Sequence, residues 1–180
     1  MGFILIRVWS KNAKIRRMKM FDCFKKKKVK TKEVLPSKKN FNWYNVALEN
    51  VEEREIRGTK NNPLIEKMFE AVIGKKLPDE TPWCAAFVGY CLKEAGYKTS
   101  GKLNARSYVS YGEEVKEEDL KKGDIVVFWR GNPNSWKGHV AFFVKFDGPN
   151  VVVLGGNQKD KVCFASYRRD RILAFRRPVG

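Results

Sequence analysis

The chain has 180 residues, of which 43% are hydrophobic and 13% aromatic, and its formal net charge at pH 7 is +17. This hydrophobic content is enough to build a core, so the composition excludes a chain that is disordered throughout, and the length predicts one domain with a tail. A transmembrane helix is not expected, because no apolar run approaches the roughly 20 residues that a span needs.

The positive charge is concentrated in the first quarter of the chain. Residues 1–40 contain 14 Lys and Arg against two acidic residues, and Lys25 to Lys28 form a run that cannot pack against itself. We therefore predict a flexible basic arm over residues 1–39 and a folded domain over residues 40–180. A solvated basic arm can bind nucleic acid, an anionic membrane surface or an anionic wall polymer, and composition does not choose among them.

Three helices are predicted in the first half of the folded domain. Loosely helical apolar spacing marks the first, over residues 43–57. The second begins at Pro63 and ends before Gly74, because proline favours the first position of a helix and glycine the position after the last. The third covers residues 82–95, with Thr81 as its N-cap. The acidic loop before it, with Asp79 and Glu80, is expected to be solvated.

The second half of the domain has the pattern of β-strands. Runs rich in valine, isoleucine and aromatic residues are separated by turn residues, of which Asp147 to Asn150 have the composition of a hairpin turn. Short turns between successive strands predict an antiparallel sheet, and helices followed by strands predict an α+β fold. The predicted strands cover residues 125–129, 139–146, 151–154, 162–167 and 172–175.

Cys84 is the first candidate for chemistry. It lies close to the predicted start of the third helix, where free backbone N–H groups and the helix dipole favour a thiolate, the nucleophilic form of cysteine. The alternative is a buried thiol of the core, a common place for a free cysteine.

His139, the only histidine, is the second candidate. It begins a predicted strand after a Gly- and Asn-containing loop, so its side chain can project into a cleft as a general base for Cys84. A structural histidine at a strand start is the alternative.

A third residue would orient the imidazole, and Asn157 is the candidate. It follows an apolar strand within Leu154-Gly155-Gly156-Asn157-Gln158, and a neighbouring antiparallel strand would bring it beside His139. By propensity alone, the Gly-Gly-Asn segment is instead a plain turn. Asp124 is expected to stabilise a turn rather than to act in catalysis.

Four sequence blocks in a fixed order resemble the CHAP family, the cysteine- and histidine-dependent amidohydrolases and peptidases, which are relatives of the NlpC-type cell-wall peptidases. Over residues 43–178 the chain is similar to the small phage- and prophage-associated branch of that family. The blocks are Pro82-Trp83-Cys84-Ala85-Ala86-Phe87-Val88, Gly123-Asp124-Ile125-Val126-Val127-Phe128, Gly138-His139-Val140-Ala141-Phe142-Phe143 and Leu154-Gly155-Gly156-Asn157-Gln158.

The resemblance implies a papain-like fold, with N-terminal helices packed on a C-terminal antiparallel sheet. It implies Cys84 as nucleophile, His139 as base and Asn157 as the orienting residue, with no metal or other cofactor. The substrate it implies is peptidoglycan, cleaved at the N-acetylmuramoyl-L-alanine bond or at a peptide crosslink. Substrate contacts are expected from Trp83, Trp136 and Gln158, and the protein is expected to be a monomer.

Features outside these blocks suggest two alternative functions. The basic arm favours a protein that binds nucleic acid or an anionic polymer and carries an inactive papain-like domain. However, no nucleic-acid-binding motif is present, and no specific nucleic acid is expected as a partner. A metal site of Cys84, Cys91, Cys163 and His139 is disfavoured, because Cys84 and Cys91 would lie about 10 Å apart along one helix.

The place of action is expected to be the cell wall, the periplasm or the outside of the cell. The apolar first nine residues lack the flanks of a signal peptide, so export is expected by another route, such as phage lysis, or the native start is Met18 or Met20.

Overall fold

The structure is a computed structural model that describes residues 42–180, so the predicted basic arm lies outside the described residues. Within them, no helix combines the length and the hydropathy needed to cross a membrane. The α-helices are α1 (Trp43–Glu49), α2 (Pro63–Ile73) and α3 (Cys84–Glu94), and the short 3-10 helices are η2 (Ala105–Tyr108), η3 (Glu117–Asp119) and η4 (Arg169–Arg171). The strands are β1 (Glu113–Glu114), β2 (Ile125–Trp129), β3 (Gly138–Asp147), β4 (Asn150–Gly155), β5 (Cys163–Arg168) and β6 (Ile172–Arg177).

Helix α2 has the predicted bounds, whereas α1 and α3 differ. Helix α1 ends at Glu49, eight residues before the predicted end, because the side-chain amide of Asn50 donates to the Val46 carbonyl at 2.6 Å and Glu52 has a positive φ of 73°. Helix α3 begins at Cys84 with Trp83 as its N-cap, so the prediction that it starts at Pro82 was wrong. Cys84 therefore occupies the first position of the helix.

The strands form one six-stranded antiparallel sheet in the order β1-β6-β2-β3-β4-β5. Strands β2 to β5 follow one another as a meander, and β6 returns to pair with β2 on its free side. The α+β class and the antiparallel sheet predicted from the sequence are confirmed. The sequence pattern did not predict the short strand β1.

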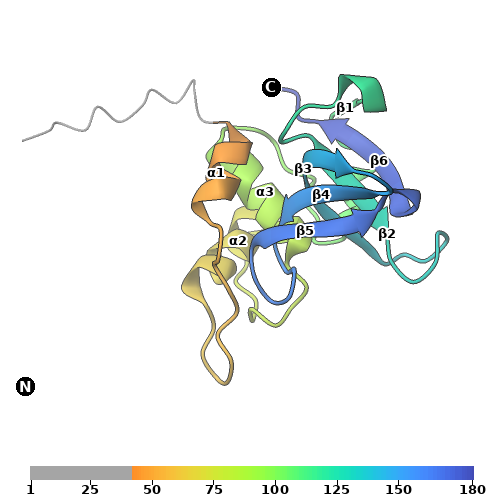
Figure 1. Ribbon diagram of the computed structural model, residues 1–180. Coiled ribbons are helices and arrows are strands. Elements are labelled where there is room, and N and C mark those ends of the chain that lie inside the picture. The colour runs from red at the N-terminus through yellow and green to blue at the C-terminus, as the bar shows by residue number, and fades with distance from the viewer. Residues whose placement is uncertain (1–41) are drawn as a thin grey trace, which may run out of the picture. The chain divides into compact units, whose positions relative to one another are not determined.

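The three helices lie on one side of the sheet (Figure 1). Side chains alternate along β2, so that Ile125 and Val127 pack toward the helices and Val126 and Phe128 pack in a second apolar cluster. Strand β3 alternates in the same way. This alternation explains why both strands appear in the sequence as continuous apolar runs, since both faces of the sheet are covered.

Two glycines at the end of β4 allow close packing, Gly156 against the start of α3 and Gly155 against β3. A Cβ atom at Gly156 would lie 2.5 Å from Cζ3 of Trp83 and 2.6 Å from Cβ of Phe87. At Gly155 it would lie 2.8 Å from Cβ of Ala141. Only residues without a side chain fit these approaches. The close packing places the polar pair that follows Gly156 beside the N-terminus of α3.

Candidate active site

Cys84 is presented by the N-terminus of α3 at the wall of a cavity. Its side chain is buried, yet together with His139 and Asn157 it lines a cavity of about 450 Å³. The first backbone N–H groups of a helix have no intrahelical partner, so this end of α3 offers donors and a positive dipole to any negative charge that develops on the sulfur or on a bound carbonyl. The predicted pair of Cys84 and His139 is thus gathered at one cavity.

His139, on β3, packs against two aromatic rings, those of Phe128 on β2 and Tyr167 on β5. Only 3% of the residue is exposed, and its ring centroid lies 6.3 Å from that of Phe128 and 5.1 Å from that of Tyr167. These contacts restrict the orientation of the imidazole.

The side-chain amide of Gln158 binds the imidazole. Oε1 of Gln158 lies 3.0 Å from Nε2 of His139, whereas Nε2 of Gln158 donates to the carbonyls of Gly155, at 3.2 Å, and of Cys163. Two carbonyls accept from the amide nitrogen, so the oxygen must be the atom that faces histidine. Nε2 of His139 is therefore the protonated nitrogen, and Nδ1 keeps a free lone pair.

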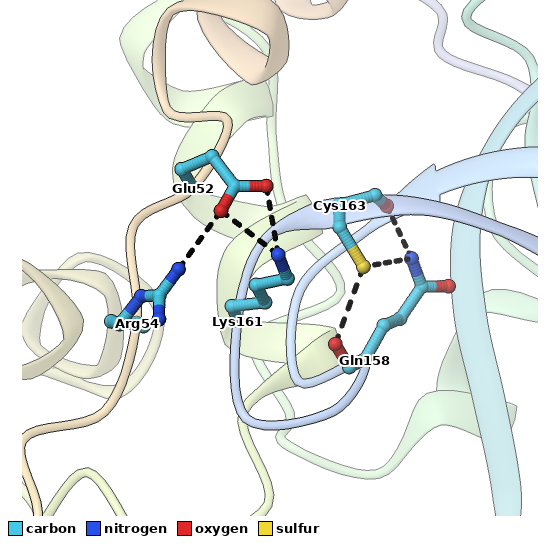
Figure 2. Close-up of polar contacts among 5 residues, drawn as sticks. All are labelled: Glu52, Arg54, Gln158, Lys161 and Cys163. Carbon is cyan, nitrogen blue, oxygen red and sulfur yellow. Dashed lines mark hydrogen bonds and ion pairs between the residues drawn. The ribbon is translucent and has the colours of Figure 1, made fainter.

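The loop that carries Gln158 is joined to the segment after α1 by hydrogen bonds and an ion pair. Figure 2 shows the side-chain amide of Gln158 next to Cys163, whose thiol lies 3.3 Å from the backbone carbonyl oxygen of Gln158. It also shows Lys161 paired with Glu52 at 2.8 Å. Backbone hydrogen bonds join the same two segments, since Val162 donates to Glu53 at 2.8 Å. The exposed ion pair adds little to stability, so these backbone bonds and the buried amide hold the loop.

Asn157 occupies a different place from the one predicted. Gln158, not Asn157, accepts the hydrogen bond from His139, which corrects the sequence prediction of Asn157 as the orienting residue and of Gln158 as a substrate contact. Asn157 has a left-handed φ of 55° and lines the cavity with Cys84. Asparagine tolerates this conformation, so the turn interpretation of Gly155 to Asn157 also holds.

Of the two tryptophans predicted to contact substrate, one is buried and one is exposed. Trp83 has no exposed surface, and its indole N–H donates to the Glu55 carboxylate at 2.7 Å. It therefore packs in the core beneath the start of α3, and the prediction that it contacts substrate was wrong. Trp136 is 72% exposed and lines the cavity with Cys84. Its position fits the predicted contact, which stays a prediction.

The acidic residues near these elements are structural. Asp79 is buried and accepts the backbone N–H groups of Ile56 and Asn62, each at 2.8 Å, so the prediction of a solvated loop was wrong for this residue. Asp124 accepts from the backbone of Lys121 at 2.7 Å, in the turn-stabilising role predicted for it, and also pairs with Arg177. Over residues 42–180, no group of three or more His, Cys, Asp or Glu is arranged to hold a metal.

Burial keeps both reactive groups neutral in the unliganded protein. Burial raises the pKa of the Cys84 thiol, and backbone N–H groups of Val140 and Ala85 and the charge of Arg130 oppose this rise. Burial also lowers the pKa of His139 to about 4, and Arg130 and Arg171 act in the same direction. The helix dipole thus does not by itself produce a thiolate here, and proton transfer from thiol to imidazole must accompany the reaction.

The depressed pKa of His139 predicts that acid destabilises the fold. Between pH 4 and pH 6.5 the unfolded chain binds more protons at this residue than the folded chain, so stability rises with pH across this window and is fully present above it. The shift corresponds to a loss of about 3 kcal/mol on lowering the pH from 7 to 4.

Urea unfolding at several pH values would measure this loss. The variant His139→Gln should lack the part of the pH dependence that is due to the imidazole, while other titrating groups contribute equally to both proteins. Equal slopes of unfolding free energy against pH for the two proteins would contradict the depressed pKa of His139.

Three residues around the cavities were missed by the sequence interpretation. Tyr167 stacks near His139, and Arg130 and Arg171 line a second cavity beside it. Tyr167 follows an alternating strand pattern, Arg130 directly follows a predicted strand, and Arg171 lies in a run of basic residues. Nothing local in the sequence indicates that β5 and η4 lie against β3.

Comparison with known proteins supports one family. Residues 76–157 match the sequence model of the CHAP domain, a segment that contains Cys84, His139 and Asn157 and ends one residue before Gln158. Among curated proteins, no sequence matches this chain.

Solved structures give more distant likenesses. An NlpC/P60 family protein from Bacillus cereus ATCC 10987 is 15% identical with a TM-score of 0.49, over 78% of this chain and 42% of that one. The P60 domain of an antigen from M. avium paratuberculosis is 14% identical with a TM-score of 0.43, over 76% of this chain and 93% of that one. The chain thus spans less than half the length of the Bacillus protein. The match over residues 76–157, just under half of the chain, shows that this segment resembles the CHAP domain.

Proposed function

We propose that this protein is a peptidoglycan hydrolase that cleaves an amide bond through Cys84, His139 and Gln158. The observation that carries the proposal is the hydrogen bond of 3.0 Å between Gln158 Oε1 and His139 Nε2, because it leaves Nδ1 as a base at the cavity that Cys84 also lines. The CHAP match supports the class of reaction and the wall as the source of the substrate.

The proposed reaction is acyl transfer by way of a thioester. Nδ1 of His139 takes the proton of the Cys84 thiol as the sulfur attacks the carbonyl carbon of the amide. The oxyanion of the tetrahedral intermediate is stabilised by the backbone N–H of Cys84 at the start of α3 and by the nearby charge of Arg130. The imidazolium then protonates the leaving amine, and the C–N bond breaks.

Water completes the reaction. His139 takes a proton from a water molecule that attacks the thioester, and the sulfur leaves as the thiolate, which recovers a proton from the imidazolium. Gln158 accepts from Nε2–H throughout and so keeps one tautomer and one ring orientation. The bond attacked is the N-acetylmuramoyl-L-alanine amide or a crosslink peptide bond, and the arm over residues 1–39 is proposed to hold the enzyme on an anionic wall polymer.

The first test is the loss of turbidity of purified peptidoglycan from several wall types. The wild type is expected to clear at least one of them, and mass spectrometry of the fragments would identify the bond from the new end groups. Heat-treated protein and the His139→Ala variant serve as controls. Failure of the wild type on every wall, with the protein folded, would refute the proposal and favour a protein that binds an anionic polymer through its basic arm and carries an inactive papain-like domain.

A further inference from the structure

Cations surround the proposed catalytic centre, and neither cavity at this centre has a carboxylate in its lining. A cavity of about 250 Å³ beside His139 is lined by Arg130, Lys159 and Arg171 and by no Asp or Glu. The neighbouring cavity that holds Cys84 adds Lys137 and again contains no acidic residue in its lining. Both cavities are therefore electrostatically suited to an anion.

These cations differ from neighbouring basic residues in lacking a counterion. Arg168 pairs with Asp170 at 2.5 Å, and Arg169 pairs with Glu117. By contrast, Arg130, Lys159 and Arg171 form no ion pair with any residue in the described range, 42–180. Their charges remain available to a ligand.

Arg171 is held in place by the protein around it. Its guanidinium carbon lies 5.0 Å from the centroid of the Trp129 ring, and the indole N–H of Trp129 donates to the Asp170 carbonyl at 3.2 Å, which fixes the turn that carries Arg171. Nε of Arg171 is buried and has no hydrogen-bond partner within residues 42–180. A buried donor without a partner is costly, so an acceptor supplied by a ligand would remove a penalty as well as add a bond.

We propose that Arg130, Lys159 and Arg171 form a subsite for a free carboxylate of the substrate peptide, an inference that rests on the hydrolase function proposed above. The two cavities share Arg130, His139 and Asn157, so a carboxylate in one lies close to a scissile amide in the other. A phosphate of a wall polymer has the same charge but belongs to a different chain from the amide. The peptide itself is therefore the better source of the anion.

The enzyme is thus expected to discriminate between acidic and amidated stem peptides. The α-carboxylate of D-isoglutamate, the second residue of the stem, is lost when that residue is amidated to D-isoglutamine. The probe is a pair of soluble disaccharide peptides that differ only in this group. For the wild type we expect kcat/KM to be roughly tenfold or more higher for the acid, because a carboxylate forms charge-assisted, bidentate hydrogen bonds with a guanidinium and a carboxamide does not.

The variant Arg171→Gln should lose this preference, because kcat/KM for the acid should fall more than kcat/KM for the amide. Arg171→Lys keeps the charge without the planar fork and should retain part of the preference. Lys75→Gln is the matched control, since it removes one exposed positive charge outside both cavities and should keep the full preference. A preference that falls in Arg171→Gln but not in Lys75→Gln locates the effect in the subsite.

Calorimetric binding of the same two peptides to Cys84→Ala protein separates this proposal from the hydrolase proposal. Tighter binding of the acid that disappears with Arg171→Gln supports the subsite even if no peptide is cleaved, in which case the hydrolase function alone is refuted. Equal cleavage of both peptides by a Cys84-dependent activity overturns the subsite and leaves the hydrolase function intact. Equal binding of both peptides, or binding of neither, also overturns the subsite.

Discussion

Cys84→Ala is expected to abolish wall clearing, with a loss of at least about 10³-fold in rate. The thiol is the atom that forms the proposed thioester, and it lines the same cavity as His139. Alanine has no group that can replace it. The measurement is the initial rate of turbidity loss at equal concentrations of folded protein, with circular dichroism to establish that the variant is folded.

Cys91→Ala is the matched control, because it removes a sulfur from the same helix. Cys91 is fully buried, lines neither cavity, and has a pKa raised by burial well above its ordinary value. We expect this variant to lose stability on the order of 1 kcal/mol through the small void that it creates, and to retain its activity per folded molecule. Clearing by Cys84→Ala at the wild-type rate would exclude Cys84 as the nucleophile, as would an equal loss in folded Cys91→Ala.

Alkylation of the thiol is a second test of Cys84 as the nucleophile. Burial raises the pKa of Cys84, so iodoacetamide is expected to react slowly with the unliganded enzyme at neutral pH. Activity should nevertheless decline in step with modification of this residue. Modification of Cys84 without loss of activity would contradict its role.

The sequence predicted those parts of the structure that depend on local pattern. Pro63 and Gly74 bound α2 as expected, because their effects on φ operate within one turn of helix. Cys84 and His139 were both candidates because each stands next to an element boundary, at a helix start and a strand start. Their place at one cavity rests on contacts between α3 and β3 that no local pattern contains, and the order of the four sequence blocks suggested it.

The remaining features depend on register and on distant segments. Whether Asn157 or Gln158 reaches the imidazole is decided by where β4 ends and by the left-handed turn at Asn157, and a shift of one residue reverses the answer. The aromatic contacts of Tyr167 and the position of Arg171 require β5, η4 and β6 to fold back along β2 to β4. The periodicity of apolar residues along the sequence does not predict contacts between segments so far apart in the chain.

Gln158→Met is expected to lower kcat by about 10²-fold or more, because it keeps the length of the side chain and removes the oxygen that binds Nε2–H of His139. Without this acceptor the imidazole samples both tautomers, and a proton on Nδ1 prevents it from acting as base. The substitution also leaves the carbonyls of Gly155 and Cys163 without their donor, at a cost of about 1–3 kcal/mol in stability. Rates must therefore be compared per folded molecule.

The pH profile distinguishes a positioning role from a purely structural one. Burial lowers the pKa of His139, and the hydrogen bond that its Nε2–H donates to Gln158 opposes this by raising the pKa. Loss of the hydrogen bond should therefore move the acid limb of kcat/KM to lower pH while the plateau falls. A variant that is merely less stable would keep the position of the limb. This shift, measured on a soluble peptide substrate, is the expected signature.

Asn157→Gly is the matched control for Gln158→Met, because glycine adopts the left-handed φ of 55° at this position without strain. It removes the neighbouring amide while keeping the turn, and we expect less than a tenfold loss of kcat with an unchanged acid limb. If folded Asn157→Gly instead lost more activity than folded Gln158→Met and shifted the limb, Asn157 would be the residue that orients the imidazole. In that case the contact between Gln158 and His139 would only stabilise the loop.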